Sequence, residues 1–240
     1  MRTTPNAMPA VTTEHPNCKV VAIFDEDVRG WQGVHQGFQV REFQEEGFLF
    51  AAVNVPPSIL AMSMPQYGAA LGQLLSDYNR MVIAGMLVED TATGRVRVTP
   101  TGRPIATYQL SDHDAAQLVR GTALLSELLF AAGARRVILP FHGVDDLRSP
   151  DDIKRIFRHK VAKSSIEVLT VHMMGTAAMG IDRSRSVVDG YGFVHDADRL
   201  MVCDASLFPG PIGVNPMLTI QALATRNMAH VLGDPRRYLS

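Results

Sequence analysis

The chain has 240 residues, of which 46% are hydrophobic and 20% are charged, and its formal net charge is −1 at pH 7. This composition is typical of a globular protein with a sizeable core, and the near-neutral charge argues against nucleic acid or an anionic membrane surface as a partner. Cys18 and Cys203 form neither a metal-ligand pattern nor a disulfide framework, which predicts a reducing, cytoplasmic compartment and no metal site.

The chain begins with a segment that we expect to be disordered, residues 1–16. It is rich in Thr and Pro and lacks the long apolar core of a secretory signal. No later apolar run reaches the ~20 residues that a membrane-spanning helix needs. Two β-strands are predicted next, at residues 18–24 and 48–55, and the second ends at a pair of prolines.

A helix is expected to follow, with Ser63 as its cap and Pro65 in its first turn. Its apolar and aromatic side chains recur three or four residues apart, as on one buried helical face. These positions are Tyr67, Ala70, Leu71, Leu74, Leu75 and Tyr78. The pattern indicates a core helix rather than a ligand site.

The middle of the chain has the pattern of a β-meander. Short β-like runs at residues 81–89, 95–99 and 105–110 are separated by polar, turn-forming residues at 90–94 and 100–104. Strands joined by such short turns are antiparallel, because a parallel crossover needs a dozen residues or more. We therefore expect all three strands to be neighbours in one sheet.

A second helix is predicted between a cap at Ser111 or Asp112 and an end signal at Gly133. Its expected buried face consists of Leu118, Thr122, Leu125, Leu128, Leu129 and Ala132. Two further strands are predicted after it, at residues 135–139 and 166–171.

His172 directly follows the last of these strands, and Gly175 and Thr176 allow the backbone to turn soon after it. A strand-end histidine that faces a cleft can accept or donate a proton near neutral pH. The alternative is a core histidine whose ring nitrogens are satisfied by neighbouring backbone groups. Taken alone, the residue is more typical of the core alternative.

Asn215 and Pro216 indicate the start of a third helix, with asparagine at the N-cap and proline at the first helical position. Its apolar positions are Ile220, Leu223, Ala224, Met228, Val231 and Leu232. Asn215 could do no more than cap this helix. However, a helix N-terminus also carries partial positive charge and unpaired N–H donors, which suit an anion or an anionic reduced ring. A pocket bounded by this N-terminus, Asn215 and His172 would suit redox chemistry.

Four motifs, in this order and at this spacing, resemble the C-terminal region of glucose-methanol-choline (GMC) flavin oxidoreductases. They lie at residues 172–180, 187–189, 200–206 and 215–223. The best-matching part spans about residues 166–232, and its sequence is most similar to the bacterial and long-chain alcohol oxidase branches of the family.

The resemblance implies an α+β fold. Residues 17–171 would form the family's substrate-binding domain, a largely antiparallel sheet with helices on one face. Residues 172–240 would form a catalytic, flavin-facing segment whose strand and helix complete an FAD-binding domain. The implied reaction is FAD-dependent oxidation of the CH–OH group of an alcohol or sugar-like substrate, by hydride transfer to the flavin.

The resemblance also assigns residues. His172 and Asn215 match the two catalytic positions, which would hold the alcohol oxygen between them while the proton leaves towards His172. The positions that match the family's flavin-contacting residues are Asp204, Ala205, Ser206, Pro216 and Met217.

One part of the family pattern is not found. Residues 1–110 contain neither the Gly-rich FAD fingerprint nor the acidic residue about 20 positions after it. We therefore expect FAD to be bound mainly by a domain outside this chain, either a partner chain or a missing N-terminal Rossmann domain. The chain alone would be inactive and would bind FAD weakly or not at all.

The alternative is a substrate-domain remnant that serves as a binding or interaction module. The substrate's identity stays open, as does the choice between oxidase and dehydrogenase.

Overall fold

The computed structural model describes residues 10–34 and 36–239, and the chain forms two compact units. The first, here called the sheet unit, consists of Pro16–Glu89 and Leu110–Thr170. The second, called the C-terminal unit, consists of Met1–His15, Asp90–Gln109 and Val171–Ser240. The last segment of the C-terminal unit begins at Val171, next to the predicted division between residues 171 and 172, and the roles predicted for the two domains stay predictions. Residues 90–109 do not follow it, because they belong to the C-terminal unit and not to the expected substrate-binding domain.

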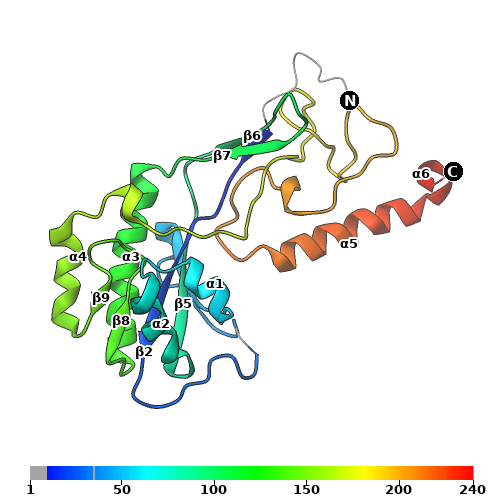
Figure 1. The fold of residues 1–240 in the computed structure, drawn as a ribbon. Coiled ribbons are helices and arrows are strands. Elements are labelled where there is room, and N and C mark those ends of the chain that lie inside the picture. Colours follow the sequence, from blue (N-terminus) through cyan, green and yellow to red (C-terminus); the bar gives the residue numbers. More distant parts are fainter. Residues whose placement is uncertain (1–9, 35, 240) are drawn as a thin grey trace. The chain divides into compact units, whose positions relative to one another are not determined.

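Within the described residues, the sheet unit is built on a six-stranded sheet in which every neighbouring pair is antiparallel (Figure 1). In spatial order its strands are β3 (Gln39–Val40), β4 (Phe48–Ala52), β5 (Met81–Val88), β2 (Asn17–Ile23), β8 (Arg136–Ile138) and β9 (Asp146–Leu147). All seven residues of β2 are buried, as expected for the nearly continuous apolar run of a central strand covered on both faces.

One face of this sheet is covered by helix α3 (Asp112–Ala131). The Ser111 side chain caps the helix by accepting a hydrogen bond from the Asp114 N–H at 3.0 Å, and Gly133 follows the helix end with φ +102°. The prediction for this helix is confirmed, except that Leu128 is 46% exposed and Ala132 is exposed. Ala132 is the C-cap residue that follows the last helical residue, and both side chains remain in contact with water.

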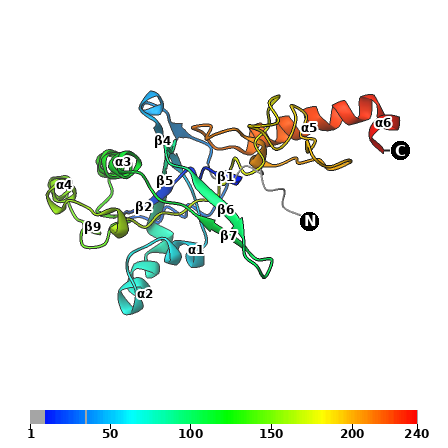
Figure 2. The ribbon, with the colours of Figure 1, turned by 90° about the horizontal axis from the view of Figure 1, so that it is seen from above.

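The opposite face is partly covered by two short helices, α1 (Pro57–Met62) and α2 (Gly68–Ser76), which Figure 2 shows on the other side of the sheet from α3. The helix predicted over these residues is present as α2, but it begins at Gly68 after Tyr67, so the predicted cap at Ser63 and the placement of Pro65 in its first turn are wrong. Ser63 instead ends α1, where its hydroxyl donates to the Leu60 carbonyl at 3.0 Å. Tyr67 is 86% exposed, and Leu74 is the buried residue of α2.

The C-terminal unit contains, in its described part, a three-stranded antiparallel sheet in the order β1 (Ala10–Thr12), β6 (Gly94–Val98) and β7 (Pro104–Thr107). The predicted antiparallel pairing of residues 95–99 with 105–110 is confirmed by β6 and β7. The continuous meander from residue 81 is wrong, because β5 pairs within the sheet unit and β6 pairs with β1. The expected disorder of residues 1–16 is also wrong for the residues described from 10 onward, because β1 pairs with β6. Residues 1–9 lie outside the description.

The chain after residue 140 has little regular structure before its last helices. Its remaining elements are η3 (Pro150–Ile153), α4 (Lys154–His159), η4 (Lys163–Ser165), η5 (Ala205–Leu207), α5 (Met217–Gly233) and α6 (Pro235–Leu239), while η1 (Gln44–Glu46) and η2 (Tyr78–Arg80) occur earlier. The strand predicted at residues 166–171 is wrong, since Ile166 and Leu169 form isolated bridges with Phe141 and Asn17. No helix in the described ranges is long and apolar enough to cross a membrane.

The packing of α3 on the sheet depends on a glycine. Gly121 lies inside α3, and a Cβ atom placed on it would overlap the Sδ and Cε atoms of fully buried Met86 on β5. Gly121→Ala is therefore expected to lower the free energy of unfolding of the sheet unit by about 1–2 kcal/mol, because the overpacking cost exceeds the gain in helix propensity. Urea denaturation followed by circular dichroism measures the change.

Gly72 provides the matched control, since it lies inside α2 with nothing within 4 Å of its added Cβ. Gly72→Ala should raise the free energy of unfolding by up to ~1 kcal/mol through helix propensity alone. Equal stabilisation by the two substitutions would contradict the tight contact between α3 and β5.

Candidate active site

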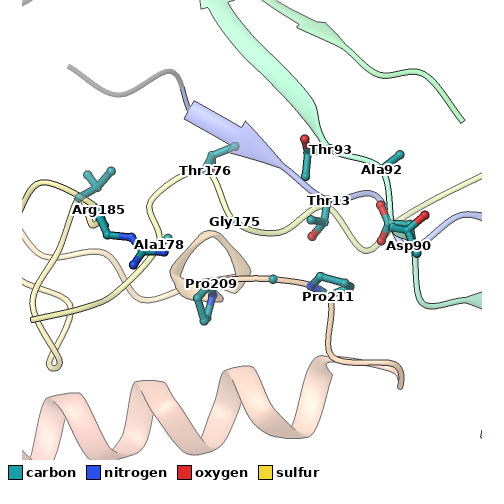
Figure 3. A pocket seen from close by; sticks show the side chains of 13 residues that line it. Thr13, Asp90, Ala92, Thr93, Gly175, Thr176, Ala178, Arg185, Pro209 and Pro211 are labelled. Carbon is teal, nitrogen blue, oxygen red and sulfur yellow. The ribbon is translucent and has the colours of Figure 1, made fainter. Parts of the chain in front are cut away.

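A pocket of about 350 Å³ lies within the C-terminal unit. Small and turn-forming side chains line most of it, and Asp90 and Arg185 bring opposite charges to its wall. Figure 3 shows these two charged side chains towards opposite ends of the pocket. Gly175 and Thr176, which follow His172 closely in the chain, also line it. The pocket is therefore bounded by the first of the four motifs found in the sequence.

His172 lies beside a second histidine that sequence reasoning did not find. The backbone groups of Thr13 and Met174 donate hydrogen bonds to each other at 3.0 Å, which pairs the two segments antiparallel. This register places residue 15 opposite residue 172. The Nδ1 atoms of His15 and His172 are 3.3 Å apart, and their ring centroids are 5.4 Å apart. His15 is 0% exposed, whereas His172 is half-buried.

Asp90 holds the backbone that presents His15. Its carboxylate accepts hydrogen bonds from the N–H groups of Glu14 at 2.9 Å and His15 at 3.2 Å. The Tyr108 hydroxyl donates to the same carboxylate at 3.1 Å. Burial raises the pKa of Asp90, and these three hydrogen bonds counteract that increase. They fix the turn at His15, whose φ of +48° is uncommon for a residue other than glycine.

Burial also determines the charge of His15. It lowers the pKa of His15 to about 4, and the nearby His172 acts in the same direction. His15 is therefore neutral at pH 7. No feature of the local sequence indicated this environment, because it depends on pairing between segments from distant parts of the chain.

The flavin-contacting positions expected at Asp204, Ala205 and Ser206 form one compact turn that includes η5. The Asp204 carboxylate accepts hydrogen bonds from the N–H of Ser206 at 2.8 Å and from its hydroxyl. The Ala177 N–H donates to the Ser206 carbonyl, and the Met179 N–H donates to the Leu207 carbonyl, both at 2.9 Å. The turn is therefore joined to the segment that follows His172, and its role at a flavin stays a prediction.

The third group of predicted residues lies at the start of α5. Here the helix begins at Met217 with Pro216 as its N-cap residue, so the predicted role of Asn215 as the N-cap is wrong. Proline cannot donate from its nitrogen, but its carbonyl accepts the Ile220 N–H at 2.9 Å and opens the helix. Asn215 is half-buried and belongs to the same unit as His172.

The apolar face expected on α5 is only partly buried. Val231 is 4% exposed, but Met228 and Leu232 are 45% and 63% exposed. The fully buried residue in the middle of the helix is polar Asn227, whose side-chain oxygen accepts from the Arg226 guanidinium at 2.8 Å. Arg226 also donates to the Gly190 carbonyl, which joins α5 to the turn at residues 189–192. Periodicity identified the helix but not the polar contacts that anchor it.

Comparison with known proteins adds an independent finding. The GMC oxidoreductase family model matches residues 90–224. An uncharacterized GMC-type oxidoreductase of Mycobacterium tuberculosis is 34% identical over 88% of this chain and 33% of that protein. A long-chain-alcohol oxidase of Arabidopsis thaliana is 32% identical over 58% of this chain and 20% of that protein. The structure of formate oxidase superposes with a TM-score of 0.60 at 12% identity, covering 95% of this chain and 47% of that one. This chain therefore spans about a third of the length of the first of these relatives.

Proposed function

Because this chain belongs to the GMC oxidoreductase family, we propose that it forms the catalytic part of an FAD-dependent enzyme that oxidises the CH–OH group of an alcohol or sugar-like substrate. The observation that carries the proposal is the placement of His172. Its ring is half-buried, it is held at Nδ1 by His15, and it comes just before the residues that line the pocket of the C-terminal unit.

In this proposal His172 is the base. Its imidazole takes the proton of the substrate hydroxyl at Nε2 as the C–H bond of the carbinol carbon breaks. The Asn215 side chain would hold the same oxygen by donating from its amide, which keeps the oxygen in place as it becomes a carbonyl. FAD, when bound, supplies the acceptor for the hydride that leaves the carbinol carbon.

The residues of this chain fit a flavin by the chemistry of their donors. The N–H groups of Met217, Leu218 and Thr219 lie in the first turn of α5, so the helix itself offers them no acceptor. Together with the helix dipole, they suit a ring system that becomes anionic on reduction. Met217 and Leu218 are 62% and 75% exposed, which adds an apolar surface beside these donors. Asp204, Ala205 and Ser206 are proposed to approach the same group.

We further propose that most of the FAD-binding surface lies in a domain outside these residues, on a partner chain or in a preceding part of a longer protein. Two observations support this. The chain spans about a third of the length of the Mycobacterium tuberculosis relative, and the apolar side chains of Met217 and Leu218 on α5 are exposed. A cytoplasmic location, expected from the cysteine content, stays a prediction.

The test is to titrate the purified chain with FAD and to follow bound flavin by absorbance and by the quenching of its fluorescence. The chain alone is expected to retain less than stoichiometric flavin after gel filtration. Addition of a matching flavin domain should then give alcohol-dependent reduction of an artificial electron acceptor.

A stoichiometric yellow protein from the chain alone would overturn the proposed division of the cofactor site. Binding of an alcohol without any dye reduction in the assembled enzyme would instead favour a non-catalytic binding module. Each result therefore decides a different part of the proposal.

A further inference from the structure

The pocket of the C-terminal unit has a polar group at each end that the proposed reaction does not use. Thr13 lies at the end formed by Asp90, and Arg185 lies at the other end (Figure 3). The pocket volume of about 350 Å³ is near the lower limit for small-molecule sites and suits a ligand the size of a monosaccharide. Small or apolar side chains line the space between the two ends, namely Ala92, Ala178, Val187, Pro209 and Pro211.

Arg185 brings a positive charge to its end of the pocket. Among the described residues, no carboxylate forms an ion pair with its guanidinium. The carboxylate of Asp182, whose charge is influenced by Arg185, accepts instead from the N–H and the hydroxyl of Ser184. Figure 3 shows the Arg185 side chain extending towards Ala178. A guanidinium binds a carboxylate or a phosphate through two parallel hydrogen bonds, so this end suits an anionic group.

Thr13 presents a hydroxyl group at the other end. The residue is 5% exposed, and its Oγ1 has no hydrogen-bond partner in the part of the chain that the structure describes. Its backbone is fixed, because its N–H and its carbonyl both form hydrogen bonds with Met174 at 3.0 Å. A buried hydroxyl without a partner is costly, and turning it towards a ligand breaks no existing hydrogen bond. This end therefore suits a hydroxyl group of a ligand.

Asp90 determines which end takes the anion. Its carboxylate repels a second negative charge, and the carboxylate oxygens already accept from the backbone N–H groups of Glu14 and His15 and from the Tyr108 hydroxyl. Asp90 is also only 5% exposed, which leaves it little capacity to bind a ligand cation. An anionic group is therefore directed away from Asp90 and towards Arg185.

The Thr13 end of the pocket is also the end beside the histidine pair. Thr13 precedes His15 by two residues, and the Nδ1 atom of His15 lies 3.3 Å from that of His172. We propose that the pocket selects hydroxylated ligands that carry a carboxylate or phosphate group, with the anion at Arg185 and a hydroxyl group at Thr13. This inference rests on the proposed function, because it places the reacting carbinol at the Thr13 end and assigns the substrate to an anionic, monosaccharide-sized class.

The test compares sugars of similar size by isothermal titration calorimetry with the folded 240-residue chain. Glucose is neutral, glucuronate and glucose 6-phosphate carry an anion at the same carbon, and glucosamine carries a cation. At least one anionic sugar is expected to bind about tenfold more tightly than glucose, and the tighter of the two identifies the carboxylate or the phosphate as the preferred group. High salt should weaken the binding of the anion and leave that of glucose unchanged, because Arg185 is exposed.

Two substitutions test the two ends. Arg185→Gln should lower the affinity for the preferred anionic sugar by about tenfold or more and leave that for glucose unchanged, because hydrogen bonds to a charged group are lost. Arg183→Gln is the matched control, since Arg183 is paired with Asp196 at 3.0 Å and does not line the pocket. Thr13→Val should lower the affinity for glucose and for the anionic sugar alike, by about 3–10-fold. Its control is Thr122→Val, because the Thr122 Oγ1 is also buried without a partner but lies on α3 in the sheet unit.

Equal affinities for glucose and both anionic sugars would overturn the proposal, and so would the absence of binding or a preference for glucosamine. Undiminished binding of the anion to Arg185→Gln, with folding checked by circular dichroism, would also overturn it. These titrations need neither flavin nor turnover. Oxidation of neutral alcohols by the assembled enzyme, without anion-selective binding, would therefore refute this site alone. Anion-selective binding without turnover of any alcohol would refute the proposed reaction alone.

Discussion

Replacing His172 with alanine is expected to lower kcat for alcohol oxidation by about 10²–10⁴-fold in the assembled flavoenzyme, because the substrate hydroxyl loses its base. The change should appear mainly in kcat, since the imidazole acts most strongly as the proton moves. Stopped-flow measurement of flavin reduction under anaerobic conditions checks this step directly. The His172 ring is half-buried and follows an irregular segment, so its loss should leave the fold intact.

His113 offers the matched control, because it is an exposed histidine on α3 in the sheet unit. His113→Ala should keep the turnover of the unmodified enzyme. Circular dichroism spectra of the two variants should coincide. Full turnover in a folded His172→Ala variant would show that another group removes the proton.

Replacing Lys19 with methionine is expected to raise the free energy of unfolding of the sheet unit by about 1–3 kcal/mol at pH 7, because a buried ammonium group is removed. Lys19 is 8% exposed, and its Nζ donates to the Asn17 Oδ1 at 2.7 Å. Burial lowers its pKa to about 8. Methionine has a similar length and needs no charged partner.

The pH dependence follows from the direction of this pKa shift. Between about pH 8 and the ordinary lysine pKa of about 10.4, the unfolded chain binds more protons at Lys19 than the folded chain, so the contribution of Lys19 to stability rises with pH. Below pH 8 both states are protonated and the full penalty remains. The gain from Lys19→Met should therefore shrink between pH 8 and pH 10. Urea denaturation of both proteins at pH 7 and pH 10 measures it.

Lys154 is the control, since it is an exposed lysine paired with Asp151 on the surface at 2.9 Å. Lys154→Met should change the free energy of unfolding by less than ~1 kcal/mol at either pH. If Lys19→Met lowered the free energy of unfolding at pH 7, the buried ammonium group would instead stabilise the folded protein.

Local patterns predicted those elements whose burial is decided within one stretch of chain. The run that starts at Cys18 is apolar enough to be central in any sheet, and β2 is central here. Ser111 and Gly133 mark both ends of α3, because a cap and a left-handed glycine act on the nearest residues.

The wrong predictions concern residues whose hydrogen-bond partners lie in a distant segment of the chain. Residues 90–94 have the composition of a hairpin turn. However, the Asp90 carboxylate accepts hydrogen bonds from the backbone N–H groups of Glu14 and His15. The strand that follows, β6, therefore pairs with β1 and not with β5. In the candidate site, too, the local sequence identified some residues and not others. His172 was recognisable from the residues around it, whereas His15 and Asp90 were not, because their role depends on the pairing of Thr13 with Met174.

The way the two units share the chain also affects how the protein can fold. The backbone passes from one unit to the other after residues 15, 89, 109 and 170, so no single cut separates them. The His15–His172 contact joins residues 157 positions apart, and closing so long a loop costs more entropy than pairing β2 with β5, whose residues lie at most 70 positions apart, as Asn17 and Leu87 do. The sheet unit can gain most of its contacts early, while the histidine pair must wait until both ends of the chain are in place. Formation of the His15–His172 pair is therefore a late step, and a ribosome-bound chain that lacks residue 172 has the residues of the sheet unit but not the proposed base.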